Sequence, residues 1–382
     1  RNCPKPSMEV AELWIYPVKG CGGVRVESAK LTPTGFELDR HWCVVDLDGH
    51  AAAPLEALSK RKLPPLATIR VSLCPDARAV ELQAEGMEPL RLPVDEPAGG
   101  AEEEACVECS GRSTTHEGAG WSLGHIAATK DARGSEWMTQ YLNRELPGGR
   151  LLSGRPRTRY GLMRSKHGLA MEAYPPVFPL VAKANVERRP EYVARFKGNQ
   201  KRFADFAPLL LVNRASALFV GKQGGALPGE EEYPIGSFRG NVVVRTDAPW
   251  VEETWGQIEI AGVTFTKIKE CPRCTVPCRD ERTGKFLFPQ DKMLLWRVLK
   301  QAFPRKFSDP EWGGWAGAFF GVYFGHAGQQ GTLRVGDPVR VLRTVSWDAH
   351  LRAGTPGAAV YVAVLLGVCA ILVGVICAYQ AK

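Results

Sequence analysis

The sequence predicts a mixed, β-dominated α+β fold, in which an amino-terminal β-barrel or curled sheet is followed by a second strand-rich domain and a carboxyl-terminal transmembrane helix. Short alternating segments separated by turn residues fill the first fifty residues, and similar segments return after residue 240. An uncharged apolar segment closes the chain. With 45% apolar and 24% charged residues the composition is globular, and 382 residues favour two domains.

The first domain is predicted to span residues 8–150. Alternating polar and apolar residues followed by tight turns are typical of short strands, and they occur at residues 10–16, 24–31, 42–46, 67–73 and 80–83. The acidic, glycine-rich segment 95–120 is predicted to be an exposed loop or insertion. A helix is expected over 135–144, because Trp137, Tyr141 and Leu142 fall on one helical face.

The second domain is predicted to span residues 151–345, because Pro147-Gly-Gly149 ends the helix and places a boundary near residue 150. Its expected strands lie at residues 242–245, 257–260, 263–268 and 338–342. A second helix is expected over 291–303, where apolar residues recur at helical spacing.

Residues 358–379 carry no charge and no proline, and as a helix they would be roughly 33 Å long, enough to cross a bilayer. Three residues follow them, so we expect a tail anchor. Arg340, Arg343 and Arg352 precede the segment and favour a catalytic part that faces the cytosol. The mitochondrial outer membrane and the endoplasmic reticulum both fit this arrangement.

The net charge of +8 arises from 49 basic and 41 acidic residues that are spread along the chain. Because the basic clusters, such as Lys60-Arg61-Lys62, lack interleaved aromatic residues, we expect no nucleic-acid binding. The charge suits a phosphate-bearing cofactor or an acidic protein partner instead. Eleven cysteines without a disulfide-like pattern indicate a reducing compartment.

The segment Cys271-Pro-Arg-Cys274-Thr-Val-Pro-Cys278 is the sharpest cluster of chemically active residues. It directly follows an expected strand, prolines stiffen it, and the neighbouring Arg273 favours the thiolate, a strong ligand for soft metals. Two alternatives stay open. The cysteines could be inert buried residues, or Cys106 and Cys109 could form a structural zinc site with Cys271 and Cys274.

Together with five other motifs, this cluster resembles the MOSC-domain family of molybdenum-cofactor proteins, and within it the mitochondrial amidoxime reducing component and its bacterial relatives. The resemblance covers residues 8–343. The motifs occur in the family's order: Leu13-Trp-Ile-Tyr-Pro-Val-Lys-Gly20, Leu38-Asp-Arg-His-Trp42, Pro208-Leu-Leu-Leu-Val-Asn-Arg-Ala-Ser216, Phe238-Arg-Gly-Asn241, the 271–274 segment and Phe320-Gly-Val-Tyr323 with Leu333-Arg-Val-Gly-Asp-Pro-Val339.

The resemblance implies a MOSC amino-terminal β-barrel domain followed by a MOSC β-barrel domain that binds the molybdenum cofactor. It implies that Cys274 is the molybdenum ligand and the catalytic centre. The residues that correspond to the family's cofactor or pocket contacts are Lys19, Arg40, Arg239, Asn241, Arg273 and Tyr323. Lysine and arginine suit this role because charge-assisted hydrogen bonds to phosphate are strong.

The chain departs from the family at several positions. Gly20 and Ala207 stand where the family commonly has hydroxyl residues, and residues 51–63 lack its usual Thr-Ala-Arg-like stretch. Segments 95–120 and 284–318 are longer, and the expected anchor lies at the carboxyl end rather than the amino end. These differences imply altered contacts to the cofactor and leave the substrate preference open.

The activity implied is that of a molybdenum-cofactor oxidoreductase that reduces small N-hydroxylated compounds, and in a related reaction nitrite. Electrons come from NADH through cytochrome b5 reductase and cytochrome b5. This chain itself has no glycine-rich nucleotide loop for NADH. The alternatives are a non-catalytic carrier of the molybdenum cofactor and an interaction module with a zinc-stapled core.

Overall fold

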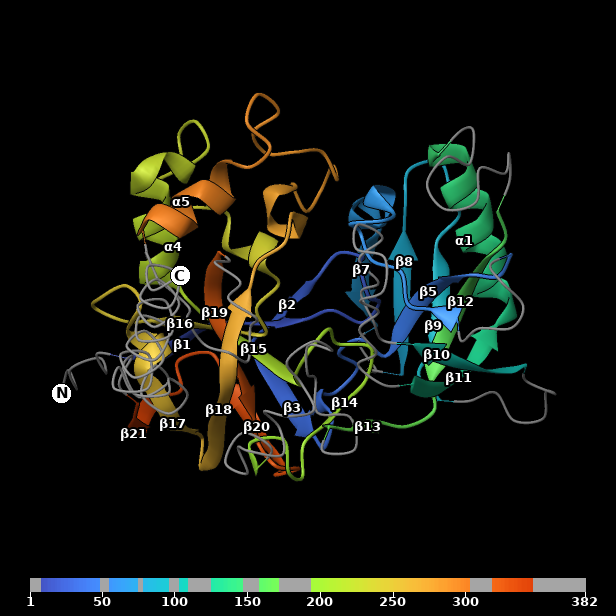
Figure 1. Cartoon of the computed structure of the whole chain (residues 1–382). Helices are drawn as coiled ribbons and strands as arrows, with labels where there is room; N and C mark the ends of the chain where they lie inside the picture. Colours follow the sequence, from blue (N-terminus) through green and yellow to red (C-terminus); the bar gives the residue numbers. More distant parts are fainter. Residues whose placement is uncertain are drawn as a thin grey trace, which may run out of the picture.

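A computed structural model describes residues 8–48, 55–74, 78–95, 103–108, 125–146, 158–171, 194–302 and 318–345. Strands dominate, and they form two lobes that lie side by side in Figure 1. One hydrophobic cluster continues through both lobes, from Leu82 and Leu142 in the first to Leu211 and Phe265 in the second. The β-dominated fold expected from the sequence is confirmed.

An eight-stranded sheet forms the second lobe. Its central strands carry long apolar runs, so both of their faces are buried. The order of the sheet is β2 (Val24–Val26), β1 (Glu9–Ile15), β16 (Val242–Arg245), β15 (Leu209–Asn213), β19 (Phe319–Gly325), β18 (Val263–Pro272), β17 (Trp255–Ile260) and β21 (Val339–Thr344). Only β15 and β16 are parallel neighbours, and α4 (Arg214–Val220), η3 (Gly221–Gly225) and η4 (Ile235–Phe238) connect them.

Helices cover one end of this sheet. Asn213 begins α4 by accepting a hydrogen bond from the backbone N–H of Ala215 at 3.1 Å. The apolar face of α5 (Leu294–Ala302) packs into the same cluster as Val220 of α4, through Leu295 and Leu299. The expected helix over 291–303 is therefore confirmed with a later start.

A five-stranded sheet and a three-stranded sheet form the first lobe (Figure 1). The larger has the order β5 (Trp42–Asp46), β12 (Tyr160–Ser165), β11 (His125–Asp131), β10 (Glu104–Glu108) and β6 (Leu55–Glu56). The smaller consists of β7 (Arg70–Leu73), β8 (Ala79–Gln83) and β9 (Leu90–Pro93). Together they give the barrel-like amino-terminal lobe that the sequence predicts.

The helix α1 (Ala132–Glu145) closes this lobe. Asp131 caps it by accepting a hydrogen bond from Gly134 N at 2.7 Å. Trp137, Tyr141 and Leu142 are buried on one face, as their spacing predicts. This helix is longer at both ends than the expected 135–144.

Three local expectations are wrong. Residues 24–31 form two strands, β2 and β3 (Ser28–Thr32), which belong to different sheets. Residues 67–73 do not form one strand, because Pro64 and Pro65 start the 3-10 helix η1 (Pro64–Thr68) and only β7 follows. The acidic segment is not all loop, since β10 within it pairs with β11 and β6. The charged side chains of β10 point outward while Val107 is buried. The strand therefore has the usual alternation of exposed and buried residues, but its glutamates make the segment look like a loop in the sequence.

The lobes do not divide at residue 150, where the sequence predicts a domain boundary, because strands from one side of that residue pair with strands from the other. β12 lies beyond that residue and pairs with β5 of the first lobe. β1 pairs with β16, and β3 (Ser28–Thr32) joins β20 (Gly331–Arg334) and β4 (Gly35–Phe36) in a separate small sheet. The first strands of the chain are thus part of the second lobe.

The segment 358–379 lies outside the described residues. Within the part of the chain that the structure describes, none of the helices has the length and apolar character needed to span a membrane.

Candidate functional site

The three cysteines of the 271–278 segment have different surroundings. β18 ends at Pro272, and a short 3-10 helix, η6 (Val276–Cys278), follows the turn. Cys271 and Cys278 are 1% and 4% exposed, whereas Cys274 is exposed and its sulfur accepts a hydrogen bond from Val276 N at 3.5 Å. Of the three, Cys274 is therefore the thiol that a ligand from outside can reach.

The side chain of Arg273 turns inward, away from Cys274. Its guanidinium donates to the carbonyl of Phe238 at 2.8 Å and to the sulfur of Cys271 at 3.2 Å. Burial raises the pKa of the Cys271 thiol, and the charge of Arg273 only partly offsets this. Arg273, which is next to Cys274 in the sequence, therefore interacts with the Cys271 thiol and lowers the pKa of that thiol in part. The Nε atom of Arg273 is buried and has no hydrogen-bond partner in the described structure.

Tyr323 belongs to the same inner group. Burial raises the pKa of its phenol well above the ordinary range, and a hydrogen bond joins it to the Cys271 thiol. The Tyr323 ring stacks on the Phe206 ring, with 5.1 Å between the two centroids. The ammonium group of Lys269 lies 3.3 Å from the centroid of the Phe206 ring. Tyr323 and Arg273 therefore surround Cys271 behind the exposed thiol.

Arg40 and Arg239 come together around one tyrosine ring. The guanidinium carbons lie 4.4 Å and 4.2 Å from the centroid of Tyr16, which is 1% exposed. Arg40 also donates to the backbone oxygen of Arg239 at 3.2 Å and pairs with Asp39 at 2.5 Å. Both arginines have a positive φ, at 48° and 57°, so the backbone at each position is strained. Such strain is found mostly where a side chain has to be aimed.

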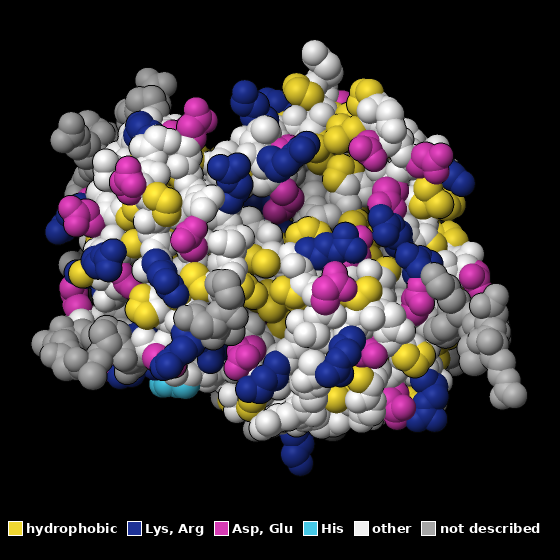
Figure 2. Space-filling model, turned by 180° about the vertical axis from the view of Figure 1, so that it is seen from behind, with side chains coloured by type: hydrophobic (Ala, Val, Ile, Leu, Met, Phe, Trp, Pro, Cys, Tyr) yellow, Lys and Arg dark blue, Asp and Glu magenta, His cyan; other side chains and the backbone are white. Residues whose placement is uncertain are grey.

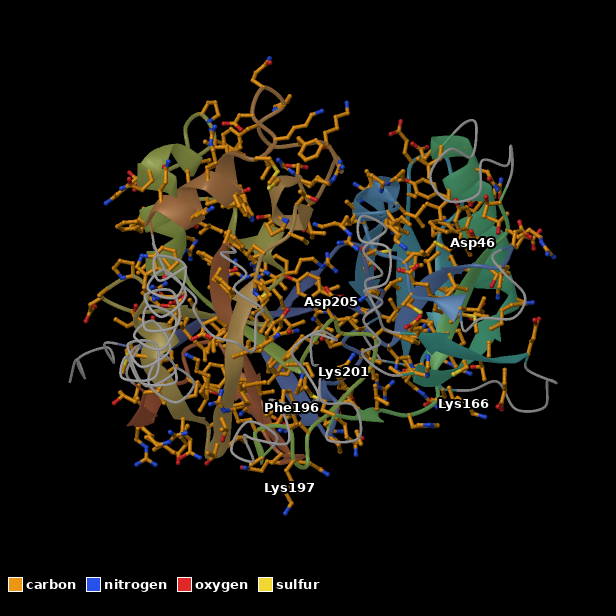
Figure 3. The ribbon with its side chains drawn as sticks, viewed as in Figure 1. Asp46, Lys166, Phe196, Lys197, Lys201 and Asp205 are labelled. Carbon is orange, nitrogen blue, oxygen red and sulfur yellow. The ribbon has the colours of Figure 1, made fainter. Side chains whose placement is uncertain are left out.

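Lys19 pairs with Asp205 and donates to the carbonyl of Phe203 at 2.9 Å. The lysine is buried, but 78% of the Asp205 side chain is exposed. Figure 3 places Asp205 near the middle of the molecule, on the segment that also carries Lys201. The charges of Lys19 and then of Arg40 and Lys201 lower the pKa of the Asp205 carboxyl below its usual range, although water screens a side chain this exposed. This carboxylate is therefore charged at neutral pH and holds Lys19 in place.

The sequence analysis missed two residues, Lys60 and Glu281. Glu281 accepts hydrogen bonds from Lys60 and, at 3.1 Å, from Arg239. Lys60 is 1% exposed, and desolvation lowers its pKa to about 8. The charge of Cys274 acts on Lys60 in the opposite sense, so the exposed thiol lies within electrostatic range of the lysine. Lys60 belongs to a basic cluster that the sequence presents as ordinary surface charge.

Asn241 has a structural place in the sheet. It is 2% exposed, its amide nitrogen donates to the Trp14 carbonyl at 3.2 Å, and its amide oxygen accepts from Leu210 N at 3.3 Å. Both ends of the side chain therefore join β1 to β15, and a role in contacting a cofactor stays a prediction.

Gly20 has a structural reason to lack a side chain. Its φ is +91°, and a Cβ atom there would lie 2.9 Å from Leu66 Cδ1 and 3.2 Å from Lys60 N. We expect Gly20→Ser to lower the free energy of unfolding by about 1–3 kcal/mol. Gly236→Ser is the matched control, because a Cβ at Gly236 meets no atom within 4 Å. Urea unfolding measures both; equal losses would contradict the steric argument.

The zinc alternative brings together residues from different sheets. Cys106 lies on β10 in the first lobe, whereas Cys271 and Cys274 lie at the end of β18 in the second (Figure 1). Cys109 lies outside the described residues. Within the described residues, no group of three or more His, Cys, Asp or Glu residues has the placement of a metal site.

The donor set suits a group that carries both a soft metal and a phosphate. A reachable thiol lies near buried cations, and soft thiolates and fixed cations are what such a group requires. The structure brings Arg40 and Arg239 together on Tyr16, and Lys19 lies in the turn that precedes Cys21. Arg273 and Tyr323 contact Cys271 directly, and Asn241 joins β1 to β15.

Two models of known protein families match the chain. Residues 7–145 match the MOSC N-terminal beta barrel domain, and residues 198–340 match the MOSC domain. The chain is 26% identical to mitochondrial amidoxime reducing component 2 of Bos taurus over 86% of this chain and 82% of that protein. It is also 26% identical to mitochondrial amidoxime-reducing component 1 of Homo sapiens, over 87% and 82%.

A third relative, molybdenum cofactor sulfurase of Bos taurus, is 25% identical over 72% of this chain but only 27% of its own length. The similarity is thus confined to one part of that larger protein. The two domain matches lie in the order that the sequence motifs predict and together span most of the described chain. The chain therefore belongs to the MOSC family, with a MOSC N-terminal β-barrel domain followed by a MOSC domain.

Proposed function

We propose that this chain is an oxidoreductase that binds the molybdenum cofactor through Cys274, with Lys19, Arg40 and Arg239 as its principal cationic contacts. The observation that supports this most is the contrast between the exposed Cys274 and its two buried neighbours, Cys271 and Cys278. Relatives named amidoxime reducing components and a molybdenum cofactor sulfurase add support. Arg273, Tyr323 and Asn241 act behind this first layer, by positioning Cys271 and the strands.

We propose small N-hydroxylated compounds as the substrates, with nitrite as a second. Removing oxygen from an N–OH group consumes two electrons and two protons and releases water. The bound cofactor would supply the two-electron redox chemistry. The chain's own cations would bind and orient the phosphate of the cofactor. Arg40 and Arg239 are held in place by the ring of Tyr16, and Lys19 is held by its ion pair with Asp205.

We propose that the electrons come from NADH through cytochrome b5 reductase and cytochrome b5. The net charge of +8 suits an acidic haem protein. Figure 2 shows lysine and arginine side chains interspersed with acidic ones over one face, an arrangement that can orient a charged partner.

Membrane attachment is a separate proposal. It rests on the uncharged segment 358–379 alone, which has the length and composition of a tail anchor. With the domains at 8–150 and 151–345 facing the cytosol, the anchor would lie in the mitochondrial outer membrane or the endoplasmic reticulum. Two of the relatives carry the word mitochondrial in their names. Tethering to the same membrane as the electron donor raises the frequency of encounter.

The non-catalytic carrier is the second candidate, because Gly20 and Ala207 provide no hydroxyl at the site. A carrier would hold the cofactor but would not accept electrons from a reduced haem partner. Stopped-flow reoxidation of that partner distinguishes the two functions.

Elemental analysis tests the proposal most directly. The whole chain, purified from a host that makes the cofactor, is expected to contain about one molybdenum per chain and a pterin that is released on denaturation. Chain recovered without metal would contradict cofactor binding. Zinc without molybdenum would support the zinc-stapled module instead.

A further inference from the structure

Glu281 joins two cations that come from different lobes. One carboxylate oxygen pairs with Lys60, which precedes η1 in the first lobe, and the other accepts from Arg239 at 3.1 Å in the second. The side chains of Lys60 and Arg239 are 1% and 12% exposed, and that of Glu281 is 22% exposed. Two buried cations thus share a single carboxylate.

Folding alone gives little reason for this arrangement. Removing a lysine from water costs free energy that one ion pair rarely recovers, and an apolar side chain of the same size is often at least as stable. Here desolvation lowers the pKa of Lys60, the Glu281 carboxylate raises it in part, and the charge of Arg239 lowers it again. Glu281 therefore offsets only one of the two positive charges that it contacts. An uncompensated positive charge in a buried place is typical of a site built for an anion.

The surroundings of Lys60 place it at the candidate site. Its backbone nitrogen lies 3.2 Å from where a Gly20 Cβ would be, directly beside Lys19 in the chain. Arg239 donates to the Cys21 carbonyl of the same turn at 2.7 Å. The charge of Cys274 also reaches Lys60. Lys60 therefore lies against the Lys19 turn and within electrostatic range of the exposed thiol.

The turn that carries Glu281 holds its shape without that side chain. Asp280 accepts hydrogen bonds from the N–H groups of Arg282 and Thr283, both at 2.8 Å, and its own N–H donates to the Lys285 carbonyl at 2.9 Å. Because these bonds do not involve Glu281, its carboxylate is free to leave the two cations while the turn stays formed.

We propose that Lys60 is a further anion-binding residue of this site, and that Glu281 is a displaceable counter-ion whose carboxylate gives way to a phosphate group. The inference rests on the proposed cofactor site and adds a residue and a loading step to it. A carboxylate with each oxygen on one cation makes the same two-point contact that a phosphate makes, and the phosphate brings more negative charge.

Binding of inorganic phosphate to the whole chain tests this inference. The protein is prepared without cofactor from a host that cannot make it, and calorimetry is carried out in slightly acidic buffer, where Lys60 is charged. We expect Glu281→Gln to bind phosphate about tenfold more tightly than the native chain, because the competing carboxylate is gone. Lys60→Met is expected to bind it about tenfold more weakly, and Lys60→Arg to restore binding.

Lys62→Met is the matched control. Lys62 lies two positions along the same segment and pairs with Glu56 at 2.5 Å, away from Arg239. The Lys62→Met variant is expected to bind phosphate with the same affinity as the native chain. In a cofactor-competent host, Lys60→Met is further expected to retain less molybdenum than Lys62→Met.

Equal phosphate affinity in Lys60→Met and Lys62→Met would overturn the role of Lys60. Weaker binding in Glu281→Gln than in the native chain would show that Glu281 is a structural clamp rather than a counter-ion. The proposed function can fail separately: a native chain without molybdenum, combined with tighter phosphate binding in Glu281→Gln, would leave an anion site that serves a different ligand.

Discussion

Cys274→Ser is expected to lower turnover of an N-hydroxylated substrate by more than about 100-fold, since even residues that only support metal ligands have effects of that order. Serine oxygen is a harder and more weakly acidic ligand than a thiol, so it replaces a soft thiolate poorly. Because Cys274 is exposed, the substitution leaves the packing of the loop unchanged. Turnover and molybdenum content of the same preparation measure the effect.

Cys278→Ser is the control for this experiment. Cys278 is 4% exposed, and desolvation raises the pKa of its thiol to about 11, so it stays protonated. We expect a loss of about 1–2 kcal/mol in unfolding free energy from burying a hydroxyl, with turnover largely kept. Equal loss of metal in both variants would indicate a structural metal held by the whole cysteine segment.

Asn241→Ala is expected to lower the free energy of unfolding by about 2–4 kcal/mol, because it leaves the buried Trp14 carbonyl and Leu210 N–H without the side chain that joins them. Urea unfolding of the cofactor-free chain measures this loss. Arg245→Ala, on the strand β16 that directly follows Asn241, is the control, with a change within about 1 kcal/mol, since the Arg245 side chain that pairs with Glu9 is 52% exposed.

The result also decides which role Asn241 has. A large loss of stability without cofactor supports the strand-joining role that its two hydrogen bonds indicate. Unchanged stability with reduced molybdenum content would favour the cofactor contact that the family resemblance implies.

Local patterns predicted several of the strands, but not the central strands β15 and β19. The strands at 42–46 and 242–245 have the expected bounds because apolar residues and turns define them within a few positions. Prolines before residue 67 converted an expected strand into a 3-10 turn, and a two-residue alternation in β10 was hidden among glutamates. In both places the amino-acid composition favoured one type of structure, whereas the prolines in one case and the alternating residues in the other favoured another.

The site was only partly predictable, for a physical reason. Cys274 and the two arginines lie in recognisable motifs, but Lys60 and Glu281 become partners only through the fold, 221 residues apart. The spacing of apolar residues along the sequence reports local secondary structure and does not indicate a contact between residues so far apart. Tyr16 was part of a motif, yet its place between two guanidinium groups follows from tertiary packing alone.

The position of β1 within the large sheet affects how the chain can fold during synthesis. β1 emerges first, but its partner β16 follows much later, and Trp14 bonds to Asn241 across 227 residues. Contacts this distant in sequence slow folding, and until they form, β16 has an open edge that can pair with other chains. β1 can pair with β2 early, but the ribosome must complete most of the protein before β16 can cover the other edge of β1, so that edge has to remain open without aggregating.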